Sequence, residues 1–171
     1  DFVSELSNNE IFRDIVNISL LNEEMMYYDE LVLRYLTLKN QGTRYTQANI
    51  QDYMDDYLES QCKDFDESRI SADRRLFEDI MNVLKGLKEQ NIFKLGKRYF
   101  TTSMYDAIML SLSEKSVNLS EVNIAELGKR IAELKEKEEF TKYVGSASSN
   151  PTSITNKVKI AKQVLLEISE L

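Results

Sequence analysis

Seven carboxylates gather in the second quarter of the sequence and could in principle hold a metal ion. They are Asp52, Asp55, Asp56, Glu59, Asp64, Asp66 and Glu67. Mg²⁺ and Ca²⁺ prefer oxygen ligands that converge on one point. The first four carboxylates, however, share a helix face opposite an apolar stripe, where a helix meets water. The residues after Cys62 also lack the spacing of a calcium-binding loop. We therefore interpret the cluster as a solvated face and predict no metal site.

The densest positive stretch follows in the middle of the chain and suggests contact with nucleic acid. Its five cations are Lys85, Lys88, Lys94, Lys97 and Arg98, and its aromatic residues are Phe93, Tyr99 and Phe100. Cations that follow phosphates, combined with rings that stack on bases, are typical of single-strand binding. In the alternative interpretation, the aromatic residues belong to the core of an irregular loop and the lysines keep that loop soluble. A weaker basic strip near the end of the chain is interpreted as exposed; it comprises Lys157, Lys159 and Lys162.

Several catalytic chemistries are excluded by residues that the chain lacks. The 171 residues include no histidine and one cysteine, Cys62. Ser-His-Asp and Cys-His catalysis, His-Asn-His nuclease chemistry and His-ligated zinc are therefore excluded within this chain. A single cysteine excludes an internal disulfide. Cys62 ends an apolar stripe, so we expect it to be buried. We predict that this chain is not an enzyme and holds no cofactor.

The overall charge argues against a protein that coats nucleic acid along its whole surface. The chain carries a formal charge of -7 and a sequence pI near 4.8, whereas such a protein needs a positive field. A local basic patch is still compatible with this charge. The apolar runs are too short to span a bilayer, and no export signal is visible. We expect a cytoplasmic protein without a membrane partner, and, because the sequence begins without methionine, the C-terminal part of a longer one.

Helical periodicity runs through almost the whole sequence, whereas the alternation typical of strands is nearly absent. We predict an all-α fold with about seven helices, packed as a compact orthogonal or bundle-like array in a single domain over residues 1–171. The expected helices begin with one after a Ser7–Glu10 capping box, followed by 22–39, 50–62, 71–90, 103–112 (capped by Ser103 and Asp106), 124–143 and 154–168. Residues 92–101 would form at most a minor hairpin, and residues 145–151 a flexible turn before the last helix.

One arginine lies within an apolar run, where a structural role is the simpler explanation. Arg34 is flanked by Leu31, Leu33 and Leu36, and Glu30 precedes it by four residues. This order favours an ion pair within a helix. An arginine among core residues often binds a carboxylate with both arms of its guanidinium, or binds backbone carbonyls. We expect Glu30 and Arg34 to form a structural pair, with a ligand or phosphate role for Arg34 as the alternative.

The segment around this arginine resembles a family motif. Asp29–Leu36 (DELVLRYL) resembles the D-E-x-L-V-L-R-F-L signature of the ParB-like, GmrSD-type family catalogued as domain of unknown function 262. Other segments that look similar to the family follow in the expected order: Ile50–Leu58, Leu76–Leu87, Ile92–Phe100, Met104–Ile108 (the family's FDA stretch) and Ser146–Ile160 (its Ser/Thr-rich turn and closing basic helix). The resemblance covers most of the chain.

The resemblance implies a helical portion that lacks the family's active site. In that family an N-terminal ParB-like domain with a D-G-Q-Q-R motif carries the chemistry, and this motif is absent here. The expected function is a non-catalytic domain of a restriction or phage-defence protein. It would support the missing N-terminal nuclease domain and contact DNA or a partner subunit, with the five central cations on the phosphates. The alternative is a free-standing interaction or oligomerisation module, for example a homo-oligomer. A metal-dependent hydrolase built on the acidic cluster is the least favoured interpretation.

Overall fold

The computed structural model describes residues 2–18, 27–96, 100–145 and 147–166. Within these ranges the chain consists of helices, turns and loops and contains no strand. The α-helices are α1 (Phe2–Ser7), α2 (Glu10–Val16), α4 (Tyr27–Gln41), α5 (Ile50–Lys63), α6 (Glu67–Lys85), α7 (Thr102–Leu112), α8 (Ile124–Glu136), α9 (Glu138–Thr141) and α10 (Pro151–Leu166). Two short 3-10 helices are η1 (Lys88–Gln90) and η2 (Leu119–Glu121). The predicted all-α class is confirmed.

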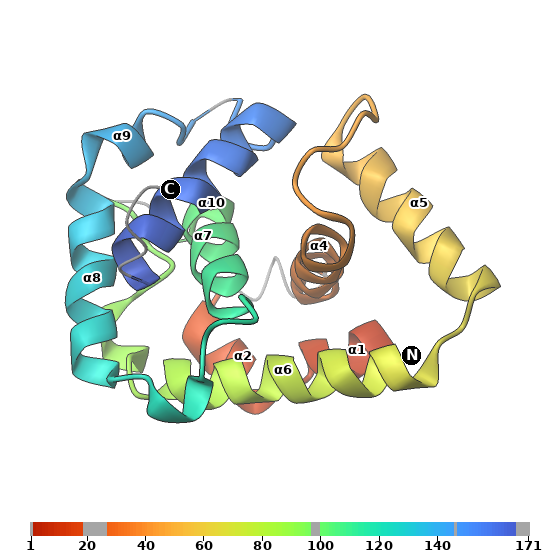
Figure 1. The fold of residues 1–171 in the computed structure, drawn as a ribbon, viewed down its shortest axis with the longest axis horizontal. Coiled ribbons are helices and arrows are strands. Elements are labelled where there is room, and N and C mark those ends of the chain that lie inside the picture. Colours follow the sequence, from red (N-terminus) through yellow and green to blue (C-terminus); the bar gives the residue numbers. More distant parts are fainter. Residues whose placement is uncertain (1, 19–26, 97–99, 146, 167–171) are drawn as a thin grey trace.

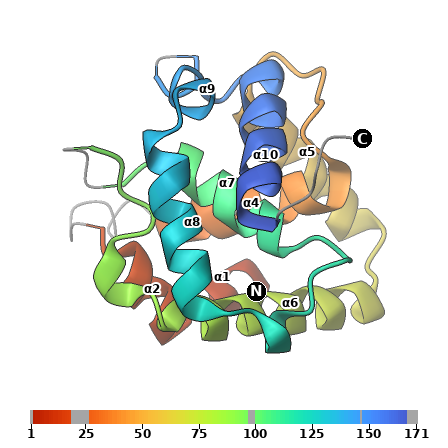
Figure 2. The same ribbon diagram turned by 60° about the vertical axis from the view of Figure 1, so that its left-hand side comes forward.

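The helices cross one another in several directions around α7. In Figure 1, α6 runs along the base, α4 is seen end-on, and α8 stands upright at the left edge. α10 packs against α7 and α8, and α1 packs against α4. Figure 2 shows α1 and α2 beside α6, at the opposite end of the molecule from α9. The arrangement is a compact orthogonal array, as the sequence predicts.

Asparagine and threonine side chains cap several helices at positions that differ from the expected ones. Asn9, not Ser7, caps α2, because its Oδ1 accepts a bond from the Phe12 amide at 3.0 Å. Thr101 caps α7 in the same way, through the Met104 amide at 3.2 Å. The predicted capping pairs at Ser7 and Ser103 are therefore wrong. A hydroxyl followed by an acid three residues later fits a cap locally, but Ser7 and Ser103 are buried and bond other partners.

One segment agrees with its predicted form and another differs from its predicted boundaries. The described residues between 92 and 101 contain no strand, which agrees with the prediction of at most a minor hairpin; the Thr101 amide donates to the Phe93 carbonyl at 2.9 Å across an irregular loop. The helix predicted over 124–143 is divided at Lys137, whose extended backbone (ψ 115°) separates α8 from α9. The start predicted for the second helix, near residue 22, lies outside the described residues.

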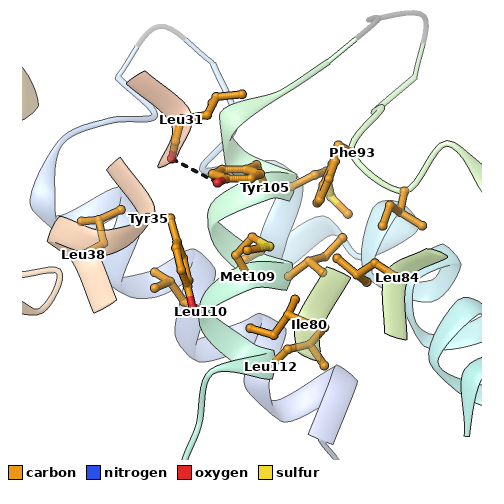
Figure 3. Close-up of a cluster of buried hydrophobic side chains, with 14 of the residues drawn as sticks. Leu31, Tyr35, Leu38, Ile80, Leu84, Phe93, Tyr105, Met109, Leu110 and Leu112 are labelled. Atoms are coloured by element: carbon orange, nitrogen blue, oxygen red, sulfur yellow. Dashed lines mark hydrogen bonds between the residues drawn. The ribbon is translucent and has the colours of Figure 1, made fainter. Parts of the chain in front are cut away.

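The core is organised around α7, in which every residue after Thr102 is buried. Figure 3 shows Tyr105 and Met109 of α7 between Tyr35 of α4 and the α6 residues Ile80 and Leu84. The Tyr105 hydroxyl donates to the carbonyl of Leu31 at 3.0 Å, so that a buried polar atom is satisfied. This phenol links α7 to α4 at the centre of the apolar core.

Aromatic rings connect the irregular loop to this core. Phe93 is buried, and its ring centroid lies 5.3 Å from that of Tyr105 in an edge-to-face contact. Phe100 lies 6.0 Å from the same ring. Edge-to-face contacts at these separations stabilise aromatic clusters. Phe93 is thus a core residue of the loop, as in the alternative interpretation, and Phe100 is partly buried and packs against the core. Tyr99 lies outside the described residues.

Helix α5 packs on one side only, and its last turn leaves the core. Tyr53, Met54 and Tyr57 are buried, but Leu58 is 42% exposed. Cys62 is exposed, so the prediction that it is buried is wrong. The helix lies at the edge of the molecule (Figure 1, yellow) and contacts α4, which covers only one of its faces. The apolar stripe of α5 is therefore longer than the part of the helix that α4 covers.

No helix in the part of the chain that the structure describes combines the length and the apolar character that crossing a bilayer would need.

A matched pair of phenylalanine variants tests the position of the core. Phe77 is fully buried, whereas Phe65 is 72% exposed. Phe77→Ala removes a buried ring and leaves a cavity, so we expect the free energy of unfolding to fall by about 3–5 kcal/mol. Phe65→Ala is expected to change it by less than about 0.5 kcal/mol. Urea denaturation followed by circular dichroism measures both, and equal losses would contradict this fold.

Candidate functional site

A buried ion pair joins α4 to α7. Arg34 Nε donates to Asp106 Oδ1 at 2.8 Å, and Arg34 Nη2 donates to Asp106 Oδ2 at 2.6 Å. The side chains are 5% and 1% exposed. Two parallel N–H···O bonds make this a bidentate pair, the strongest common geometry between arginine and carboxylate. The guanidinium is therefore held in one orientation inside the protein.

Arg34 binds a carboxylate with both arms of its guanidinium, but the predicted partner, Glu30, is wrong. Glu30 lies exposed, one turn before Arg34, and the carboxylate that Arg34 binds comes from residue 106. A guanidinium removed from water needs a partner that is also buried. Because Arg34 faces α7, Asp106 meets this need, whereas Glu30 faces solvent.

A second buried cation lies beside this pair. Lys157 of α10 is fully buried, so its interpretation as part of an exposed strip is wrong. Its Nζ donates to Ser103 Oγ and to the Ser148 carbonyl, each at 2.7 Å. The pKa of Lys157 is lowered to about 8: burial lowers it, the charge of Asp106 opposes this effect, and the charge of Arg34 adds to it. The ammonium is held by neutral oxygens and not by a carboxylate of its own.

The turn before α10 closes over these charges. Arg34 Nη2 reaches Ser149 Oγ at 3.4 Å, and the Tyr45 hydroxyl donates to the Ser149 carbonyl. The Ser153 amide donates to Asn150 Oδ1 at 2.8 Å, which caps the helix that follows. The segment that the sequence predicts as a flexible turn is therefore bonded to the interior at Ser148 and Ser149.

We call the set Arg34, Asp106, Lys157, Ser103 and Ser149 the buried charge cluster. It contains two cations and one carboxylate. Asp106 accepts bonds from Arg34 on both oxygens and is 1% exposed, so a substrate cannot reach this carboxylate. Lys157 is fully enclosed, so a substrate cannot reach its amine. The geometry is suited to positioning three segments relative to one another.

The sequence positions of two members of the cluster, Lys157 and Asp106, indicate burial but do not identify the partners of these residues. Lys157 follows Ile154 by three residues and precedes Ala161 by four, which places it on the apolar stripe of its own helix. Asp106 lies in an otherwise apolar stretch between Tyr105 and Ala107. Charged residues at core positions are rarely buried without a partner. Their positions therefore signal a buried pair, although only the fold identifies which residues pair.

Of the central cations, the described ones are Lys85, Lys88 and Lys94, and these do not all line the same groove. Lys88 forms an ion pair with Asp14, and together with Lys85 it borders a groove that also contains Glu10, Asp14 and Glu89. Lys94 instead faces Lys135, whose pKa is lowered by burial and by the charge of Lys94. Lys97 and Arg98 lie outside the described residues. The described members of the predicted nucleic-acid site are thus divided between an acid-rich groove and a separate pair of lysines.

The acidic residues of α5 and the following turn remain spread along the surface. Within the described ranges, no three acidic, cysteine or histidine side chains come close enough together to hold a metal ion.

Comparison of the chain with protein-family models, with curated proteins and with solved structures finds no match.

Removing one partner of the buried pair tests its role. In Asp106→Asn the Arg34 guanidinium stays buried without a counter-charge, so we expect a loss of about 3–5 kcal/mol in the free energy of unfolding. The control is Glu5→Gln, which removes the counter-charge of the partly exposed Arg74; we expect less than about 1 kcal/mol there. Chemical denaturation measures both variants. Similar small losses would show that the buried pair does not hold the helices.

The lowered pKa of Lys157 predicts a dependence of stability on pH. The folded protein loses this proton near pH 8 and the unfolded chain near 10.5, so the unfolded chain binds more protons between these values and stability rises with pH. Relative to Lys157→Met, the wild-type free energy of unfolding should rise by about 2 kcal/mol from about pH 7 to about pH 9.5. Urea titrations across this range measure it. A constant difference would mean that Lys157 titrates normally.

Proposed function

We propose that this chain is a non-catalytic helical domain of a restriction or phage-defence protein of the ParB-like, GmrSD type. In this role it supports an N-terminal nuclease domain and contacts DNA or a partner subunit. The observation that carries the proposal is the composition of the buried charge cluster. Arg34 comes from the DELVLRYL segment, Asp106 from Met104–Ile108, and Lys157 and Ser149 from Ser146–Ile160.

Three of the segments on which the resemblance rests therefore meet at one point in the fold. In the sequence, Asp106 lies 72 residues after Arg34, and Ser149 lies 115 residues after Arg34. A chance likeness of short motifs gives no reason for their polar residues to pair. A shared buried pair gives such a reason, because each motif then supplies one part of the same contact.

The state of the buried carboxylates favours a supporting role. Asp106 is bound by Arg34, and Asp73 of α6 accepts bonds from Lys39 and from Asn40 of α4. Within the described residues these are the two buried acidic side chains. A general acid or base must exchange its proton with a substrate, whereas both of these groups are occupied in joining helices. The proposal therefore includes no cofactor in this chain, and an exposed free Cys62 accords with a cytoplasmic location.

An interaction module is the second candidate, and a specific observation favours it. Phe65 and Leu58 are the large exposed hydrophobic residues of the described chain, at 72% and 42%. They lie at the corner between α5 and α6, among carboxylates. Exposed apolar groups of this kind mark partner surfaces when they are contiguous. Self-association that depends on Phe65 would favour this role over the support of a nuclease.

The absence of turnover is the first test of the proposal. We expect the isolated 171-residue chain, incubated with plasmid DNA, nucleoside triphosphates and Mg²⁺, to release no nicked DNA and no phosphate above a buffer control. Gel electrophoresis and a phosphate assay measure this. Turnover that disappears in Asp106→Asn at a temperature where that variant is folded would contradict the proposal. The reading frame upstream of Asp1 is the second test: a D-G-Q-Q-R segment there would support the family, and its absence would favour the interaction module.

A further inference from the structure

Cations that are far apart in the sequence line a single groove. The groove has a volume of about 760 Å³ and lies where the end of α4, the middle of α6, the end of α7 and α10 meet. We call it the basic groove. Its charged residues are Lys39, Arg44, Lys115, Lys159, Lys162 and the acid Glu114. Five cations and one carboxylate thus line one groove of a chain whose net charge is -7.

Part of this positive charge is already neutralised within the fold. Lys162 forms an ion pair with Glu114, and Lys39 forms one with the buried Asp73. The other three cations, Arg44, Lys115 and Lys159, are exposed. Among the described residues, no carboxylate lies within ion-pair distance of these three. They are therefore available to an anion from outside.

The helix ends account for only some of these charges. α4 ends at Gln41 and α7 at Leu112, and the C-terminal end of a helix carries partial negative charge that nearby cations offset. Lys39 lies in the last turn of α4, and Arg44 and Lys115 each lie three residues beyond the end of a helix, so these cations are close enough in sequence to have this effect. Lys159 lies in the middle of α10. Its charge offsets no helix end and remains as excess.

The rest of the lining narrows the class of ligand. Of the apolar side chains in the groove, Leu38, Leu110 and Val158 are each at least 93% buried and Leu76 is half-buried, so the exposed charges of the groove lie on its cations. No aromatic ring is among the groove's described lining residues, so bases have no stacking surface of the kind that single strands use. Thr43 and Thr155 bond each other at 2.8 Å across the groove. What remains is a row of cations that suits a sugar-phosphate backbone.

We propose that the basic groove binds the phosphate backbone of double-stranded nucleic acid, with Arg44, Lys115 and Lys159 as the main contacts. The inference deepens the proposed function, because it names the surface through which the domain contacts DNA. It also replaces the central cations of the sequence analysis as the site of that contact. Backbone contacts of this kind position a protein without reading base sequence.

Salt dependence of binding to a DNA duplex tests the assignment. A fluorescent duplex of about 20 base pairs titrated with the 171-residue chain should bind in the range typical of non-specific contacts, on the order of 10⁻⁶ to 10⁻⁴ M. In the triple variant R44A/K115A/K159A, the slope of log K against log salt should become shallower by about 2 to 3. Each lost phosphate contact lowers the magnitude of this slope by about 0.9. Circular dichroism checks that this surface variant stays folded.

The matched control is K85A/K88A/K94A, which removes the same charge from the predicted central stretch. It should keep a slope within about 1 of the wild type. Equal slopes for the wild type and the groove variant would overturn the proposal. An unchanged affinity of the groove variant together with a reduced affinity of the control variant would also overturn it. So would the absence of wild-type binding at about 50 mM salt. Inorganic phosphate and unlabelled duplex are also compared as competitors at equal phosphate concentration. If they compete equally well, the groove binds small anions, and the proposal is overturned. None of these outcomes bears on turnover or on the upstream reading frame, so they are separate from failure of the proposed function.

Discussion

The pairing of Arg34 with Asp106 is the constraint on which the rest of this structure depends. A guanidinium and a carboxylate removed from water each lose several kcal/mol of hydration, and only close, bidentate contact offsets this loss. The 2.6 and 2.8 Å bonds require α4 and α7 to lie at one rotation and one height relative to each other. Apolar packing has no such directional requirement, since many rotations of the same helices would bury similar areas.

The third helix of the cluster is fixed by weaker but equally directional bonds. Lys157 of α10 reaches Ser103 of α7, and the turn that carries Ser148 and Ser149 closes over both cations. The orientation that turns Lys157 inward places Lys159 and Lys162 on the side of α10 that lines the basic groove. α4 likewise carries Arg34 to the cluster and Lys39 to the groove. The surface that we propose for nucleic acid is therefore a consequence of the buried charges beneath it.

Residues in these helices also show where reasoning from sequence succeeds and where it stops. The periodicity of Ile50, Tyr53, Met54 and Tyr57 predicts a helix, and α5 begins at Ile50. The same periodicity extends to Cys62, which is exposed because no described helix packs over this side of the last turn. Ser103 and Asp106 fit a cap by spacing, but Thr101 occupies that position. Periodicity and capping are local properties, whereas burial depends on which surface a neighbouring helix supplies.

The sequence by itself determined the helical class, the main apolar faces and the lack of the residues that histidine- and disulfide-based chemistry needs. These follow from residue types and from spacings within one turn of a helix. The tertiary structure alone decided that Asp106 and not Glu30 binds Arg34, that Lys157 is buried, and that cations spread from Lys39 to Lys162 line one groove while the dense stretch from Lys85 is divided. Charges act through distance in space, and proximity along the chain sets that distance only within an element.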